Sequence, residues 1–308
     1  MDRSYTKFLV KHKYTFLIAD LILEVNCELD IPIEILLPNF MPFFCERSNE
    51  TPICRIDIIN ENLGFENYES TLLSDISIVW GDRFTFWESE NFYWTVVQGD
   101  GLPEDKWVMR SDKGFINNEI QIGTMKRDVH HLVSWFLMVA FAQSGLSHKS
   151  ILIHSSVVQE IDGECAFGFL GKSGTGKSTH SQLWLKYLHG YSLLNDDNPI
   201  VRIMPSQEVR IFGTPWSGKT KCYKNESRNL GGLVRLNQAP YNKFEIKNNK
   251  EALIALLPSC SALRWNNSLY SRLVDLLIEL INTVKIGQLD CLPDEEAAVL
   301  CSQQLINQ

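Results

Sequence analysis

Short apolar runs that alternate with polar residues fill the first 125 residues of the chain. The run 16–26 is long and partly β-branched, and 55–58 alternates with a period of two, as strands do. Further strands are expected at 80–87, which is rich in aromatic residues, and at 92–97, 106–110 and 115–122. Because short polar turns separate several of these runs, the pattern predicts a mainly antiparallel β-rich domain over residues 1–125.

Helical spacing replaces this pattern at residues 126–148. Apolar residues recur on one face from Val129 to Phe141, and Gly145 is expected to end the helix, which we predict to connect the two halves of the chain. From residue 149 the pattern is mixed. It predicts strands at 151–153, 166–170, 192–194, 199–204, 209–212, 230–236 and 286–292, and helices at 178–188, 269–284 and after Pro293. The fold expected is therefore mixed α/β (α+β), with an α/β core and C-terminal helices over 149–308.

Composition narrows the class of protein. The chain has 308 residues, of which 44% are hydrophobic and 21% charged, as in soluble globular proteins. Its eight cysteines form no CxxC pair, so no zinc or redox spacing is present, and eight in 308 residues are too sparse for a disulfide scaffold. The N-terminus has no signal-peptide pattern, and the apolar run 15–25 is interrupted by Asp20 and is too short to span a bilayer. We therefore expect a reduced, cytoplasmic protein with no membrane partner.

Charge is unevenly distributed along the chain. Residues 1–150 carry 22 acidic and 13 basic residues, whereas residues 151–308 carry 15 and 16, for a total net charge of −8. An acidic first half argues against nucleic acid as a partner. A near-neutral second half is better suited to a polyanionic ligand.

The segment from Gly171 to Ser178 reads GKSGTGKS and fits the pattern G-x-x-x-x-G-K-[ST] at every position. Its glycines allow backbone N–H groups to converge on a polyphosphate, and a following helix N-terminus favours negative charge. Lys177 is expected to reach the β- and γ-phosphates, and Ser178 to ligate Mg²⁺. An apolar run precedes the segment and a helix-compatible one follows, which is the order the pattern requires.

We therefore predict a nucleoside triphosphate site, with ATP and Mg²⁺ as its ligands. Its residues are Gly171, Lys172, Ser173, Gly174, Thr175, Gly176, Lys177, Ser178 and Thr179.

Two adjacent carboxylates, Asp196 and Asp197, follow the short apolar run 192–194. A strand that returns from the helix after the phosphate loop would bring its end beside that loop. One carboxylate could hold Mg²⁺, and the other could accept a proton from an attacking hydroxyl. Neighbouring side chains on a strand point in different directions, so the two residues can divide these roles.

His154 ends the apolar run 151–153, which we expect to lie beside the strand that leads into the phosphate loop. There its imidazole would face the γ-phosphate as a proton or charge partner. The alternative is a structural histidine at a strand end.

A second segment, residues 213–220 (GTPWSGKT), has the same spelling as the phosphate loop. Pro215 and Trp216 occupy positions where backbone donors should surround the phosphate, and no clean helical pattern follows. We therefore reject it as a second nucleotide loop and expect a mobile loop of the active site. Whether residues 213–219 contact substrate is left open.

Taken together, these segments resemble the HPr kinase/phosphorylase and phosphoenolpyruvate carboxykinase group of P-loop proteins. Residues 171–181 (GKSGTGKSTHS) are similar to the phosphate loop of both, and residues 194–197 to their paired aspartates at a strand end. His154 resembles the histidine of HPr kinase in its position. The segments GTPWSGK and LPDEEAAVL resemble those of small HPr-kinase-like proteins found with peptide-modification systems. The resemblance covers residues 149–300.

This resemblance implies an HPr-kinase-like phosphotransferase that moves the γ-phosphoryl group of ATP to a hydroxyl, often of a serine in a peptide or protein. By it, Lys177 would bind phosphate, Ser178 and Asp197 would hold the metal, Asp196 would be the base, and His154 would support the transferring group. The C-terminal signature for phosphorolysis is not found. A carboxykinase-type lyase and a non-catalytic nucleotide-binding regulatory module remain as alternatives, and homo-oligomerisation and ATP versus GTP stay open.

Overall fold

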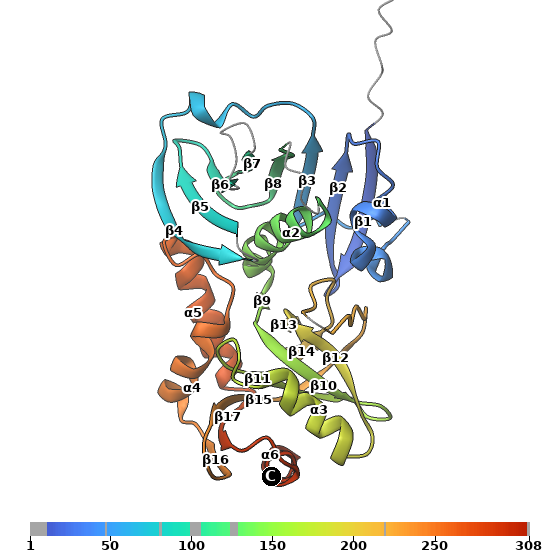
Figure 1. The fold of residues 1–308 in the computed structure, drawn as a ribbon, viewed down its shortest axis with the longest axis vertical. Helices are drawn as coiled ribbons and strands as arrows, with labels where there is room; N and C mark the ends of the chain where they lie inside the picture. The colour runs from blue at the N-terminus through green and yellow to red at the C-terminus, as the bar shows by residue number, and fades with distance from the viewer. Residues whose placement is uncertain are drawn as a thin grey trace, which may run out of the picture. The chain divides into compact units, whose positions relative to one another are not determined.

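The computed structural model describes residues 11–46, 48–79, 82–98, 106–123, 129–218 and 220–306. The chain divides into two compact units (Figure 1): Met1–Leu17 with Leu21–Ser144, and Ile18–Asp20 with Gly145–Gln308. Each unit is built on a mixed β-sheet with helices, so the mixed α/β fold expected from the sequence is confirmed. Residues 126–128 of the expected connecting helix, and Lys219 of the expected active-site loop, lie outside the described residues.

The first unit contains an eight-stranded sheet in the order β1-β2-β3-β8-β7-β6-β5-β4. Its strands are β1 (His12–Ile18), β2 (Leu21–Cys27), β3 (Cys54–Ile59), β4 (Thr71–Val79), β5 (Asp82–Glu88), β6 (Tyr93–Gln98), β7 (Lys106–Ser111) and β8 (Asn117–Gln121). Strands β4 to β8 form the expected antiparallel meander. However, β3 pairs in parallel with both β2 and β8, which turn patterns could not predict because these pairings join segments distant in sequence.

Helix α2 (Val129–Gly145) lies in the first unit as far as Ser144, and its last residue, Gly145, begins the main segment of the second unit. Trp135 of α2 packs on Phe84 of β5, with ring centroids 3.7 Å apart, and Ser134 accepts a hydrogen bond from Asn39 Nδ2 at 3.2 Å. Within the described residues, the helical stretch Val129–His148 is long and apolar enough to cross a membrane. However, 72% of its apolar window is buried inside the protein, as the core helix of a globular unit also is.

Short helices complete the first unit. They are α1 (Ile33–Leu36), η1 (Pro38–Phe43) and η2 (Phe65–Asn67).

The second unit contains a nine-stranded sheet whose main path is β12-β10-β11-β15-β14-β13-β9, with β17 and β16 continuing from β15. Its strands are β9 (Ser150–Leu152), β10 (Ser155–Glu160), β11 (Cys165–Leu170), β12 (Tyr191–Asp197), β13 (Ile200–Ile203), β14 (Val209–Phe212), β15 (Ser227–Gln238), β16 (Lys243–Ile246) and β17 (Lys285–Cys291). Strand β10 is antiparallel to both β11 and β12. Strands β11 and β12 therefore run in the same direction, and their C-terminal ends meet one edge of the sheet.

The position expected for the strand before His154 is wrong. Strand β9 pairs with β13 at the far end of the sheet, not with the strand that leads into the phosphate loop. The two strands beside β11 are β15 and β10, and β10 begins directly after His154. The strands expected at 199–204 and 209–212 are present as β13 and β14, which pair antiparallel as a hairpin.

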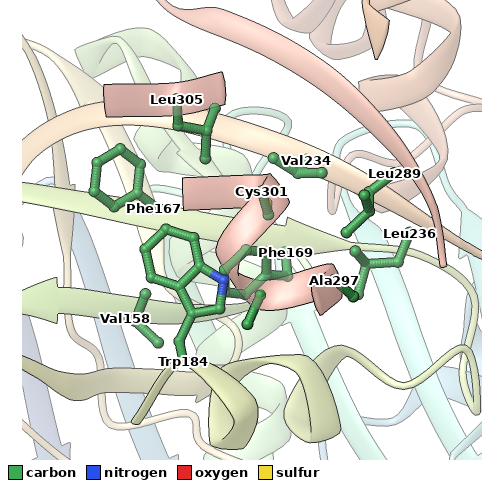
Figure 2. Close-up of a cluster of buried hydrophobic side chains, with 11 residues drawn as sticks. Val158, Phe167, Phe169, Trp184, Val234, Leu236, Leu289, Ala297, Cys301 and Leu305 are labelled. Atoms are coloured by element: carbon green, nitrogen blue, oxygen red, sulfur yellow. The ribbon is translucent and has the colours of Figure 1, made fainter. Parts of the chain in front are cut away.

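The helices of the second unit are α3 (Lys177–Tyr187), η4 (Leu146–His148), α4 (Asn249–Leu256), η5 (Leu257–Ser259), α5 (Asn267–Ile281) and α6 (Glu295–Ile306). Figure 2 shows the buried cluster in which α3 and α6 pack against the sheet. Trp184 of α3 and Leu305 of α6 lie there against Phe167 and Phe169 of β11. Burial of these large side chains fixes α3, and hence its N-terminus at Lys177, on the strand that precedes the phosphate loop.

Candidate functional site

The chain turns through a glycine-rich loop between the end of β11 and the start of α3. Gly174 and Gly176 have φ angles of +83° and +99°, a backbone conformation that side-chain-bearing residues rarely adopt. The order strand, loop, helix that the sequence predicted is present, with α3 beginning at Lys177. The loop therefore has the backbone shape that its glycine pattern requires.

Carbonyl groups of the loop are held by other protein groups. The Lys172 carbonyl accepts from Thr175 N–H at 3.1 Å and from Thr175 Oγ1 at 2.6 Å. The Gly171 carbonyl accepts from Lys177 Nζ at 3.1 Å, and the Gly174 carbonyl accepts from Gln238 Nε2 at 3.2 Å. These bonds draw the carbonyls to protein donors, so they do not compete for the space that a bound anion would take.

Amide groups of the same loop remain available. Within the described part of the chain, the N–H groups of Ser173, Gly174 and Gly176 donate to no protein acceptor. Free amides gathered in a loop at the N-terminus of a helix can bind an anion, and the helix dipole reinforces this. The loop can therefore hold phosphate groups.

The half-buried ammonium group of Lys177 lies close to these amides. Burial lowers the pKa of Lys177 from its ordinary value, and the negative charges of Asp197 and Asp196 oppose that change. A cation that loses water in this way is stabilised by a further anion nearby. Lys177 is therefore placed to pair with a phosphate on the loop.

Both aspartates lie within strand β12, at its C-terminal end. Asp196 is buried, with 4% of its surface exposed, and its Oδ1 accepts a hydrogen bond from Ser178 Oγ at 2.8 Å. The family resemblance assigns the metal to Ser178 and Asp197, and that assignment stays a prediction; in this structure the hydroxyl of Ser178 contacts Asp196. The described residues contain no group of three or more His, Cys, Asp or Glu side chains that could hold a metal ion. A phosphate-loop metal site needs only a hydroxyl and a carboxylate from the protein, and Ser178 Oγ and Asp196 Oδ1 lie 2.8 Å apart.

Asp197 pairs with His154. Nε2 of His154 lies 3.0 Å from Oδ1 of Asp197, and the two side chains are 40% and 36% exposed. His154 reaches the site because it directly precedes β10, whose first residue, Ser155, is in register with Asp197. Its backbone N–H donates to the Ser259 carbonyl at 2.7 Å, which fixes the chain at this point.

The segment of residues 213–218 lies beside the aspartates. Gly218 N–H donates to the Asp196 carbonyl at 2.7 Å, and Ser217 forms a β-bridge with Asp197. Residues 220–226, which lead into β15, contain no helix, so the segment lacks the helix N-terminus that a nucleotide loop needs. Its rejection as a second nucleotide loop is consistent with this geometry.

Two contributors to the site were not singled out from the sequence. Gln238, at the end of β15, donates a hydrogen bond to the Gly174 carbonyl of the phosphate loop. Ser156 of β10 contacts Ser181 of α3 through a buried pair of hydroxyl groups 2.7 Å apart. No local pattern marks either residue, because both act through pairings between distant segments. All eight cysteines are free thiols.

No family model matches the chain, and no curated protein matches it. The resemblance to HPr kinases and carboxykinases therefore stays a prediction.

Proposed function

We propose that the chain is an ATP- and Mg²⁺-dependent kinase that transfers the γ-phosphoryl group to a hydroxyl, that of a serine in a peptide or protein. The observation that carries the proposal is the group of free amides at the start of α3, with Lys177 and two carboxylates of β12 beside it. Phosphoryl transfer requires an anion site for the phosphates, a cation beside it, and carboxylates that can hold a metal ion or accept a proton.

The residues present fit the two ligands. The free amides of Ser173, Gly174 and Gly176 would hold the phosphates, and Lys177 would reach the β- and γ-phosphates. Ser178 and one of the two aspartates would hold Mg²⁺. When bound, the metal supplies positive charge that offsets the charge of the phosphates.

The chain's own residues would position the γ-phosphate and accept the proton of the acceptor hydroxyl. The loop and Lys177 fix the position of the γ-phosphate, and a carboxylate accepts the hydroxyl proton as the new bond forms. The choice of a serine acceptor is supported by the family resemblance alone.

The test uses the full chain with γ-labelled ATP and Mg²⁺, offered a library of serine peptides that includes peptides encoded by neighbouring genes. Mass spectrometry locates the modified residue, and calorimetry measures ATP binding. Label on serine that requires Mg²⁺ supports the proposal, with Lys177→Ala as the inactive control. ATP binding without transfer favours the regulatory module. Formation of phosphoenolpyruvate from oxaloacetate and ATP or GTP favours the lyase, and either outcome overturns the kinase proposal.

A further inference from the structure

We infer that a cavity on the first unit binds a lysine or arginine side chain of the acceptor peptide, apart from the serine that receives the phosphoryl group. The cavity lies between the turn that joins β5 to β6, at residues 88–92, and the segment at the end of η2, at residues 67–71. Its volume is about 570 Å³. This inference rests on the proposed phosphoryl transfer and adds to it the class of acceptor.

Three carboxylates and no positive charge line the cavity. Glu69 comes from the segment 67–71, Glu88 and Glu90 come from the turn, and none of the nine lining residues in the described part of the chain is basic. Lys113 pairs with Glu88 at 2.7 Å, whereas the exposed Glu69 and Glu90 form no ion pair within the described residues. Two carboxylates are therefore left to attract a cation that enters from solvent.

Aromatic rings of the same walls provide a second attraction for a cation. Tyr68 and Phe92 line the cavity, and their rings meet edge-on with centroids 6.3 Å apart. The guanidinium of Arg110 already lies over the Phe92 ring, 4.9 Å from its centroid, and Arg110 lines a smaller cavity that Phe92 also lines. Such rings hold cations by the negative charge of their faces. The same aromatic cluster is presented to the larger cavity, whose described lining residues include no cation.

Trp94 of β6 holds both walls of the cavity in place. It is fully buried, and its indole N–H donates to Ser89 Oγ of the turn at 3.0 Å. On the other wall, its ring centroid lies 4.8 Å from that of Tyr68 and 5.4 Å from that of Phe65. Ser89 N–H also donates to the Phe92 carbonyl at 3.0 Å, which closes the turn. Because these contacts form without a ligand, binding does not have to order the walls, and less affinity is lost.

This lining suits a long organic cation better than a metal ion. A calcium-like ion needs several oxygen ligands close together, and the described residues hold no group of three or more His, Cys, Asp or Glu side chains that could bind a metal. Aromatic walls instead accommodate a guanidinium group or the apolar stem of a lysine. Residues 1–150, with 22 acidic and 13 basic side chains, attract a basic peptide as a whole.

The test measures peptide binding separately from phosphoryl transfer. Fluorescence anisotropy on the full chain, without nucleotide, compares labelled serine peptides that differ only in carrying arginine or its neutral analogue citrulline, and lysine or acetyl-lysine. We expect the charged peptide of each pair to bind about fivefold more tightly or better, and the difference to shrink as salt screens the carboxylates. Equal affinities within both pairs overturn the inference.

Variants locate the binding to the cavity. The double variant Glu69→Gln with Glu90→Gln should abolish the difference between charged and neutral peptides. Thr71→Arg should do the same, because it places a cation in register with Glu88 across β4 and β5. The matched control, Glu50→Gln with Glu61→Gln, removes the same charge from exposed residues outside the cavity and should keep the difference. An equal loss in both double variants would show an effect of net charge alone and would overturn the inference.

Transfer from γ-labelled ATP to the same peptides separates this inference from the proposed function. The double variant Glu69→Gln with Glu90→Gln should raise the KM for the arginine peptide and leave kcat and ATP affinity unchanged. A wild type that prefers the charged peptides but transfers nothing overturns the kinase and leaves the cavity as a site for basic peptides. Transfer to charged and neutral peptides with equal KM overturns the inference and leaves the kinase.

Discussion

The indole N–H of Trp184 donates a hydrogen bond to Nε2 of His180, one turn earlier on α3, at 3.2 Å. This bond requires the unprotonated form of that ring nitrogen, because a protonated nitrogen has no lone pair to accept it. His180 is buried, and its ring also packs edge-on against Phe169 of β11. The helix that begins at the phosphate loop therefore carries a neutral histidine in its core-facing side.

Acid should destabilise the second unit through this histidine. Burial lowers the pKa of His180 from 6.5 to about 4. Between these pH values the unfolded chain binds the proton and the folded chain does not, so stability is full above pH 6.5 and falls as the pH falls towards 4. The loss should amount to roughly 3 kcal/mol.

Urea unfolding at about pH 7 and about pH 4.5 measures this effect, with His180→Gln as the matched variant because its amide oxygen can still accept from Trp184. His180→Gln should lose less stability between the two pH values than the wild type. An equal loss in both proteins would contradict the prediction.

Leu305 should be a main anchor of α6. It is 3% exposed and packs in the cluster of Trp184, Phe167 and Phe169 (Figure 2). Leu305→Ala would leave a cavity there and should lower the free energy of unfolding by about 2–4 kcal/mol. The neighbouring Ile306 is 48% exposed, so Ile306→Ala should cost less than about 0.5 kcal/mol. Urea unfolding of both variants checks the difference, and equal effects would argue against Leu305 as the anchor.

Local sequence patterns were sufficient to predict the elements whose interacting residues lie close together in the sequence. The phosphate loop was predictable because glycines, Lys177 and Ser178 occur at fixed spacing between an apolar strand and a helix. The β13–β14 hairpin was predictable because its two strands are close in the sequence. Neither prediction requires knowing which distant segments pair with these residues.

Strand β10 was missed because its sequence, SSVVQE, carries polar residues at buried positions. The hydroxyl of Ser156 bonds to that of Ser181, and Nε2 of Gln159 donates to Glu226 at 2.7 Å, so these groups find partners that are distant in sequence. Buried polar residues of this kind remove the alternation by which a strand is recognised.

The same non-local pairing decides the geometry of the site. That His154 meets Asp197, and that Ser178 meets Asp196, both depend on the register of β10 with β12. A shift of one residue would exchange the faces of the two carboxylates. No pattern in the segment around Asp196 and Asp197 specifies that register.

Lys177 should contribute more to nucleotide affinity than to the stability of the fold. Removing its ammonium group takes away a charge-assisted bond to phosphate, so Lys177→Ala should weaken ATP binding by about tenfold to a hundredfold. The free protein should keep its melting temperature or gain slightly, because the half-buried cation is disfavoured there by lost hydration. Calorimetry and thermal unfolding measure both effects, with Lys186→Ala at the end of α3 as the control. ATP affinity unchanged in Lys177→Ala would argue against a phosphate contact.

Gly218 should be required for transfer but not for nucleotide binding. A Cβ at this position would lie 2.8 Å from the Asp196 carbonyl oxygen and 3.3 Å from Asp197 Cβ. Gly218→Ala would therefore push the 213–218 segment away from β12, weaken the 2.7 Å bond to the Asp196 carbonyl, and disturb the orientation of Asp197.

We expect Gly218→Ala to slow transfer by about tenfold or more while ATP affinity changes little, because misplacing a reacting group is costly even at small displacements. The phosphate loop lies between β11 and α3, whereas the 213–218 segment contacts β12, so the affinity measured by calorimetry separates the two effects. Gly114→Ala is the control, since its Cβ would be 3.4 Å from the Ile116 side chain, an ordinary contact. Normal transfer by Gly218→Ala would show that the close approach of this segment to β12 does not set the geometry of Asp197.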